Sequence, residues 1–262
     1  MVAVSQRPLE RTTTSATASG QDRLGLRRLI ILHLAPGAVF TVFLIFATQA
    51  VKSWGIDPSF ALFGGIGLVL VPLELGYLAA YARRTTGSWS PLEAVDFRQR
   101  VPLGRLILLS GGLAVWFFLC LVVSIAFLDE WLAEHVFSWM PHALLQFSTV
   151  EQDGSSPTSL ELIAFLVIAF ACNGVAGPIT EELYFRGHLL PRLERYGRWA
   201  PVINTVLFAS YHFFSPWRYP AIIVGFLPIT WMAWRKRSVL VSIAAHMMIN
   251  MATVLLIAAA LA

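Results

Sequence analysis

Charged residues are scarce in this chain. They make up 13% of its 262 residues, whereas hydrophobic residues make up 57% and the mean hydropathy is +0.68. A soluble domain typically carries about 25% charged residues, so this composition excludes an ordinary soluble domain and indicates an integral membrane protein. The apolar residues come in long unbroken runs rather than in short alternating strands, which favours helices and excludes a membrane β-barrel.

Cysteine is also rare. The two cysteines, Cys120 and Cys172, both lie in apolar runs and show no Cys-x-x-Cys spacing. We interpret them as small buried side chains rather than as a disulfide or as metal ligands.

The apolar runs predict an all-α, polytopic membrane helix bundle of about seven to eight transmembrane helices, since roughly 20 residues are needed to cross a bilayer. We place the spans at residues 29–51, 60–81, 106–128, from 160 onward, 200–214, 221–234 and 239–261. We expect the fourth span to be broken near Gly177-Pro178. Residues 1–28 are rich in Ser and Thr, and we expect them to form a mobile cytoplasmic tail before a single transmembrane domain at 29–262.

Basic residues are concentrated in alternate connections. Along a seven-span path, the tail and segments 82–105, 192–198 and 235–237 fall on one side, while segment 129–159, which has no Lys or Arg, falls on the other. The positive-inside rule then predicts that the N-terminus and the basic loops are cytoplasmic, with the protein in the cell membrane. The net charge of +4 is therefore an orientation signal, and we expect the lipid bilayer, not a nucleic acid, as a partner.

Ionisable and amide side chains interrupt the late apolar runs at three places. The first is Glu181-Glu182 with Arg186, the second is His212, and the third is His246 with Asn250. With a rise of 1.5 Å per residue, Glu181, His212 and His246 lie about 14 to 21 Å from the arginines that end their spans. Charges inside a bilayer are costly and usually mark function, so three such places at one depth predict a single buried site.

These residue types suit amide hydrolysis, which requires a base for water, an oxyanion stabiliser and a proton for the leaving amine. A carboxylate in apolar surroundings is a competent base near neutral pH, which makes Glu181 the candidate. Glu182 and Arg186 are four residues apart and are expected to form an ion pair. His212 is expected to help activate water or to bind a metal. His246 and Asn250, also four apart, are candidate oxyanion donors or metal ligands.

Each motif alone also fits a structural role. The acidic pair could favour a helix N-terminus capped by Thr180, and a lone histidine often makes an interhelical hydrogen bond. We interpret His33, near Pro36, as a structural residue. Glu74 is an intramembrane acid that could be a buried partner or a gate, and the sequence leaves its role open.

Taken in order, Glu181-Glu182-x-x-x-Arg186, Phe208-x-x-x-His212 and His246-x-x-x-Asn250 resemble the three-motif signature of the CPBP family. These are the CAAX-protease and bacteriocin-processing, or Abi, intramembrane endopeptidases. The resemblance covers roughly residues 160–256. It implies a membrane-embedded peptidase in which Glu181 and His212 activate water and His246 and Asn250 stabilise the oxyanion.

The resemblance leaves the cofactor open, because family members are labelled metalloproteases while a purely glutamate-based mechanism is also argued for them. Glu181, His212, His246 and Asn250 are candidate zinc ligands, but Asn is a poor zinc ligand and no His-Glu-x-x-His motif is present. The spans contain no Asp and no Gly-x-Ser motif, which excludes the other common intramembrane protease chemistries.

The leading hypothesis is therefore a peptidase that cleaves a membrane-associated peptide or protein. The alternative is a non-catalytic bacteriocin-immunity or scaffold protein that retains the cavity. A transporter ranks last, because transporters typically show two matched broken helices and we find one. The sequence does not identify the substrate or say whether it is prenylated.

Overall fold

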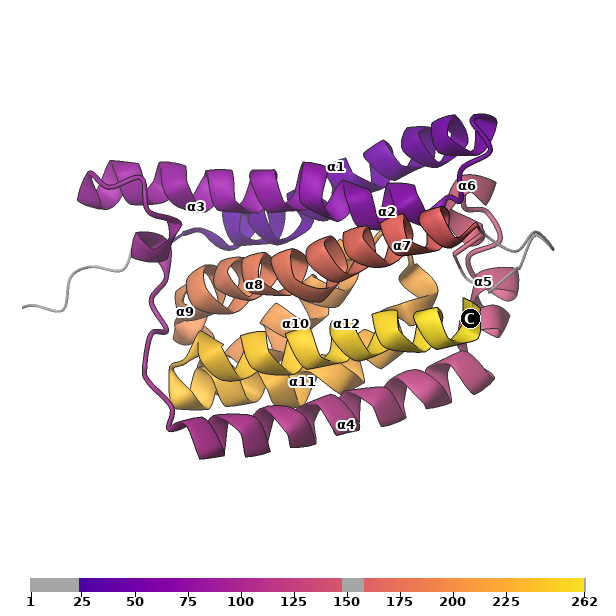
Figure 1. Cartoon of the computed structure of the whole chain (residues 1–262). Coiled ribbons are helices and arrows are strands. Elements are labelled where there is room, and N and C mark those ends of the chain that lie inside the picture. Colours follow the sequence, from indigo (N-terminus) through magenta and orange to yellow (C-terminus); the bar gives the residue numbers. More distant parts are fainter. Residues whose placement is uncertain (1–23, 148–157, 262) are drawn as a thin grey trace, which may run out of the picture.

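The computed structural model describes residues 24–147 and 158–261, which form a bundle of long helices lying side by side (Figure 1). Within these two ranges the chain forms no strand, apart from one isolated bridge between Arg98 and Ser238. The helices are α1 (Leu26–Ser53), α2 (Ser59–Gly65), α3 (Val71–Thr86), α4 (Leu103–Phe127), α5 (Asp129–His135), α6 (His142–Leu145), α7 (Ser159–Ile168), α8 (Gly177–Glu181), α9 (Leu190–Arg192), α10 (Ala200–Tyr211), α11 (Tyr219–Lys236) and α12 (Val239–Leu261). The predicted all-helical membrane bundle is confirmed.

Five stretches of the described chain are long and apolar enough to cross a membrane. They are Leu26–Ser53, Ser59–Thr86, Leu103–Phe127, Ser159–Arg192 and Val239–Ala259. Their outward faces carry large apolar side chains, such as Leu108 and Leu160, that are exposed in the described structure. The remaining two predicted spans are also helices of the bundle. However, α10 has only 12 residues, and both α10 and α11 pack against several other helices of the bundle.

The predicted tail lies mostly outside the described residues, since its first 23 positions are not among them. Helix α1 begins at Leu26, before the predicted start of the transmembrane domain at residue 29. The acidic segment 129–159 contains the short helices α5 and α6, and its residues 148–157 are likewise outside the described part.

The helix that carries the acidic pair runs from Ser159 to Arg192 and includes two π-helical segments, Ala169–Ala176 and Glu182–Leu189. The break expected near Gly177-Pro178 takes the form of the first segment, which comes directly before these two residues. Pro178 has no N–H with which to continue the α-helical pattern, and a wider turn accommodates this loss without ending the helix.

Polar side chains connect this helix to its neighbours. Asn204 on α10 donates to His33 Nε2 at 3.0 Å and to the Phe185 carbonyl oxygen at 3.1 Å, while His33 Nδ1 donates to the Leu29 carbonyl oxygen at 2.7 Å. The Tyr184 hydroxyl donates to the Leu32 carbonyl oxygen at 2.8 Å. His33 therefore has the structural role that we expected, at the contact between α1, α10 and the helix with the acidic pair.

A connecting segment, residues 87–102, crosses the end of the bundle. Pro191 cannot donate to the Gly187 carbonyl oxygen, which instead accepts the Asp96 N–H at 2.9 Å. The Asp96 carboxylate pairs with Arg192 at 2.8 Å, and Val239 N–H donates to the Phe97 carbonyl oxygen at 3.0 Å. The segment thus ties the helix with the acidic pair to the start of α12.

One glycine permits a close approach of α1 to the end of α10. A Cβ atom built on Gly37 would lie 1.9 Å from the Tyr211 carbonyl oxygen and 2.7 Å from its ring. Because the blocking atom belongs to the backbone, it cannot move without moving the chain that leads to His212.

We expect Gly37→Ala to lower the free energy of unfolding by about 1 to 3 kcal/mol, the usual cost of overpacking. The measurement is thermal unfolding of the detergent-solubilised protein, followed by circular dichroism. Gly64→Ala is the control, because Gly64 is also helical and its Cβ would meet nothing within 4 Å. Equal melting temperatures for the two variants would contradict this packing.

Candidate functional site

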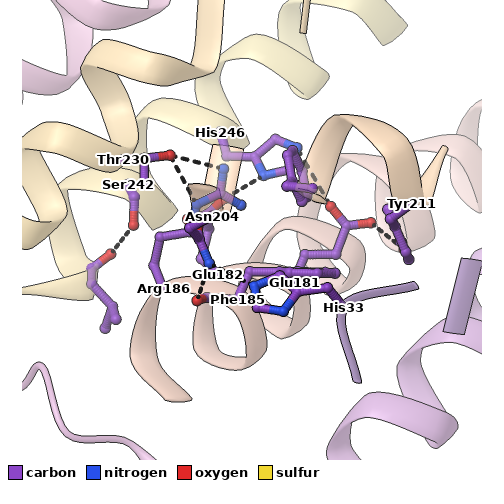
Figure 2. Close-up of polar contacts among 12 residues, drawn as sticks. His33, Glu181, Glu182, Phe185, Arg186, Asn204, Tyr211, Thr230, Ser242 and His246 are labelled. Carbon is purple, nitrogen blue, oxygen red and sulfur yellow. Dashed lines mark hydrogen bonds and ion pairs between the residues drawn. The ribbon is translucent and has the colours of Figure 1, made fainter. Parts of the chain in front are cut away.

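A buried ion pair lies at the centre of the site. Arg186 Nη1 is 3.1 Å from Glu182 Oε1, and both side chains are 0% exposed (Figure 2). The two residues are four apart, as the sequence predicted, and the pairing persists although Glu182–Leu189 is π-helical. The predicted pair therefore exists, with both charges fully removed from solvent.

The Arg186 guanidinium is held by residues from other helices. It donates to Thr230 Oγ1 on α11 from Nε at 3.3 Å and from Nη2 at 3.1 Å. Its central carbon lies 4.0 Å from the ring centroid of Phe208 and 5.2 Å from that of Phe226. These aromatic faces provide a favourable environment for a cation whose side chain is 0% exposed.

His246 on α12 extends the pair to a second carboxylate. Its Nδ1 lies 3.0 Å from Glu182 Oε1, and because a carboxylate only accepts, Nδ1–H is the donor. The other ring nitrogen, Nε2, lies 3.9 Å from Glu181 Oε2. The histidine therefore stands between the two neighbouring glutamates, as Figure 2 shows.

Glu181, the last residue of α8, has two differently placed oxygens. Oε1 accepts a hydrogen bond from the Tyr211 hydroxyl at 3.2 Å, and Oε2 faces His246. The residue is 8% exposed, so it is buried but not fully enclosed. Among the residues that the structure describes, no Lys or Arg forms an ion pair with it, in contrast to Glu182.

Tyr211 is a site residue that the sequence reasoning missed. It comes directly before His212, and a hydroxyl in an apolar run next to a candidate histidine was the available signal. Which way its ring points depends on how α10 is rotated, and sequence periodicity alone does not determine this rotation.

His212 follows the last residue of α10 and leaves the helical conformation, with φ −79° and ψ 53°. Its Nδ1 donates to the Phe208 carbonyl oxygen at 2.9 Å, so Nε2 of the neutral ring is the acceptor. The ring packs against Tyr211, with the centroids 4.8 Å apart, and interacts electrostatically with His246 and Arg186. The half-buried His212 thus borders the site, and in the described structure it makes no hydrogen bond to Glu181 or Glu182.

Asn250 lies one helical turn after His246 on α12 and is also half-buried. Its Nδ2 donates to the Asn173 carbonyl oxygen at 2.9 Å and is 3.4 Å from Asn173 Oδ1. Asn173 belongs to the first π-helical segment. The sequence analysis placed Asn250 in the site, but it did not identify Asn173 as its partner.

The loop after His212 is anchored at its far end. Trp217 is fully buried, and Arg218 Nε lies 3.6 Å from Asp129 Oδ2, whose other oxygen accepts from Ser124 at 2.5 Å. Burial lowers the pKa of the Arg218 guanidinium, and the charge of Asp129 acts in the opposite direction. The end of α10 before His212, and the buried Trp217 and the Arg218–Asp129 contact after it, therefore fix the position of His212.

A zinc site requires at least three protein ligands. In the part of the chain that the structure describes, no group of three or more His, Cys, Asp or Glu side chains is arranged to hold a metal ion. Glu181 and His246 provide two close donors, while the Asn250 amide nitrogen is directed to Asn173. The candidate set Glu181, His212, His246 and Asn250 therefore does not fit a metal in this arrangement.

Residues 163–252 match the family model described as Rce1-like, type II CAAX prenyl endopeptidase Rce1-like. Comparisons with curated proteins and with solved structures gave no match. The matched segment runs from α7 into α12 and includes all three motifs, in agreement with the resemblance to the CAAX-protease family. Over residues 163–252, the chain is thus similar to the Rce1-like family, whose description is that of a prenyl endopeptidase.

Proposed function

We propose that this protein is an intramembrane endopeptidase that hydrolyses a peptide bond of a membrane-associated peptide or protein. The observation that carries the proposal is the position of Glu181, a buried carboxylate anchored by Tyr211 and facing His246. The family description suggests prenylated CAAX-type C-termini as the first substrates to test.

In the proposed reaction, Glu181 takes a proton from water as the water oxygen attacks the scissile carbonyl carbon. The half-buried His212 shares in positioning the water through its acceptor nitrogen, Nε2. The carbon–nitrogen bond then breaks, and the proton held by Glu181 passes to the leaving amine. Atoms and charges balance, and the carboxylate is regenerated.

The oxyanion formed in this reaction requires nearby donors. His246 provides one when both of its ring nitrogens carry a proton, and the Glu182 carboxylate at 3.0 Å balances the resulting positive charge. Asn250 provides another, since its 3.4 Å contact with Asn173 Oδ1 is long enough for a substrate oxygen to replace it. Glu182 and Arg186 support the reaction by holding His246 and the helix that carries Glu181.

The orientation of the site is part of the proposal. We place the N-terminus and the basic loops in the cytoplasm, with the protein in the cell membrane. The connecting segment 87–102 and the turn at Arg235, Lys236 and Arg237 then lie on the same side. The charge pattern of these segments supports this orientation under the positive-inside rule.

Removal of the proposed base should abolish turnover. We expect Glu181→Gln to lower kcat about 10²- to 10⁴-fold, because general-base catalysis contributes about this much. The measurement is cleavage of a fluorogenic farnesylated CAAX peptide in proteoliposomes, with thermal unfolding as a check on the fold. Glu130→Gln, at an exposed glutamate on α5, is the matched control. Turnover by Glu181→Gln at the wild-type rate would refute the proposed function.

The ion pair should behave as a unit. We expect Glu182→Gln and Arg186→Met each to lower the free energy of unfolding by about 3 to 5 kcal/mol, because each leaves a buried charge unpaired. The double variant should be more stable than either single variant, since it removes both charges. Thermal unfolding of the three proteins gives the comparison, and additive losses in the double variant would contradict the pairing.

The donor geometry also predicts how the protein responds to metal removal. We expect protein treated with a chelator, and shown by elemental analysis to be free of zinc, to cleave the peptide at the untreated rate. Loss of cleavage that added zinc restores would show that Glu181 and the histidines rearrange to bind the metal.

A further inference from the structure

A third buried glutamate lies next to the site. Glu74, on α3, is 0% exposed, and neither of its carboxyl oxygens has a hydrogen-bond partner of normal geometry among the described residues. Helix α3 packs against α8, which ends at Glu181. A carboxyl group that is buried in this way requires an explanation, because an ionised oxygen without a donor is costly.

The Tyr211 hydroxyl is the polar group that connects Glu74 to the site. This hydroxyl, also fully buried, is 3.2 Å from Glu181 Oε1 and also interacts with the Glu74 carboxyl group. Other charged or titratable groups that interact with Glu74 include Glu181, Glu182, Arg186 and Tyr184. Among these, Arg186 is already paired with Glu182, and the Tyr184 hydroxyl donates to Leu32.

The number of hydrogens available for donation determines how Glu74, Tyr211 and Glu181 are joined. A tyrosine hydroxyl has one hydrogen and can accept through its lone pairs. When that hydrogen goes to Glu181, Glu74 can join the hydroxyl only by donating a hydrogen of its own. In the described part of the chain, the oxygens of an ionised Glu74 would have no donor of normal geometry, and Arg186 is already paired with Glu182.

We propose that Glu74, in its protonated form, and Tyr211 form a hydrogen-bond chain that ends on Glu181 and positions its carboxylate for catalysis. Glu74 donates to the Tyr211 oxygen, and Tyr211 donates to Glu181 Oε1. Oε1 is therefore occupied, and Oε2, on the side of His246, is the oxygen that receives the proton from water. Glu74 and Tyr211 are positioning residues, and their effect on catalysis rests on the proposed role of Glu181 as the base.

The first test does not depend on activity. Infrared spectra of wild type at neutral pH should contain the C=O stretching band of a protonated carboxylic acid, and Glu74→Gln should lack it. Glu130→Gln, at an exposed glutamate, should leave the band unchanged. If wild type and Glu74→Gln have the same spectrum in this region, the proton is not on Glu74 and the proposal is wrong, whatever the protein cleaves.

The second test uses two matched tyrosines. Tyr211→Phe and Tyr184→Phe each remove one buried hydroxyl, but only Tyr211 contacts Glu181. We expect Tyr211→Phe to lower kcat about 10- to 100-fold with KM unchanged, because a hydrogen bond to a charged group is lost. Tyr184→Phe should keep the wild-type kcat. Equal kcat values for the two variants would overturn the chain.

The third test separates a neutral Glu74 from a charged one. The carboxamide of Glu74→Gln can donate to Tyr211 as a protonated carboxyl group does, so we expect kcat within about threefold of wild type. Glu74→Met fills the space without a donor and should lose as much kcat as Tyr211→Phe. Equal kcat for the Glu74→Gln and Glu74→Met variants would overturn the proposal.

If wild type shows no cleavage that depends on Glu181, the proposed function fails, and the infrared band still decides the protonation of Glu74.

Discussion

The buried pair of Glu182 and Arg186 is the constraint on which the rest of the structure depends. Two charges without solvent are stable only if each is paired and its remaining hydrogen-bonding groups are satisfied. The partners here come from different helices: Phe208 from α10, Thr230 and Phe226 from α11, and His246 from α12. These helices must close around the acidic helix for the pair to be tolerated. The contacts that pack these helices together are therefore the same contacts that assemble the site.

The two neighbouring glutamates have different environments, and this difference supports the separate roles proposed for them. Glu182 is fully enclosed, with Arg186 and His246 on the same oxygen. Glu181 has a hydroxyl on one oxygen and a histidine at 3.9 Å from the other, and it retains some exposure. Carboxylates whose surroundings differ in this way typically divide structural and catalytic work. His212 and Asn250, in contrast to Glu182, are only half-buried.

Irregular helix geometry provides several of the contacts around the site. The π-helical segment Ala169–Ala176 presents Asn173 to Asn250, and Pro191 leaves the Gly187 carbonyl oxygen free for Asp96. Both arrangements follow from prolines that cannot donate a backbone hydrogen bond. The prolines thus redirect backbone groups from the helix to neighbouring segments instead of ending the helix.

The amino-acid sequence by itself determined the helical membrane class, the pairing of Glu182 with Arg186, and the three motifs that the family match covers, because composition and i,i+4 spacing are local properties. Only the tertiary structure decided that Tyr211 holds Glu181, that Asn173 holds Asn250, that Glu74 lies beside the site, and that α10 packs against both α1 and α11. These contacts depend on the rotation of each helix about its axis. One extra residue in a π-helical turn changes that rotation by about 100°, so a periodicity read along the chain does not carry across it.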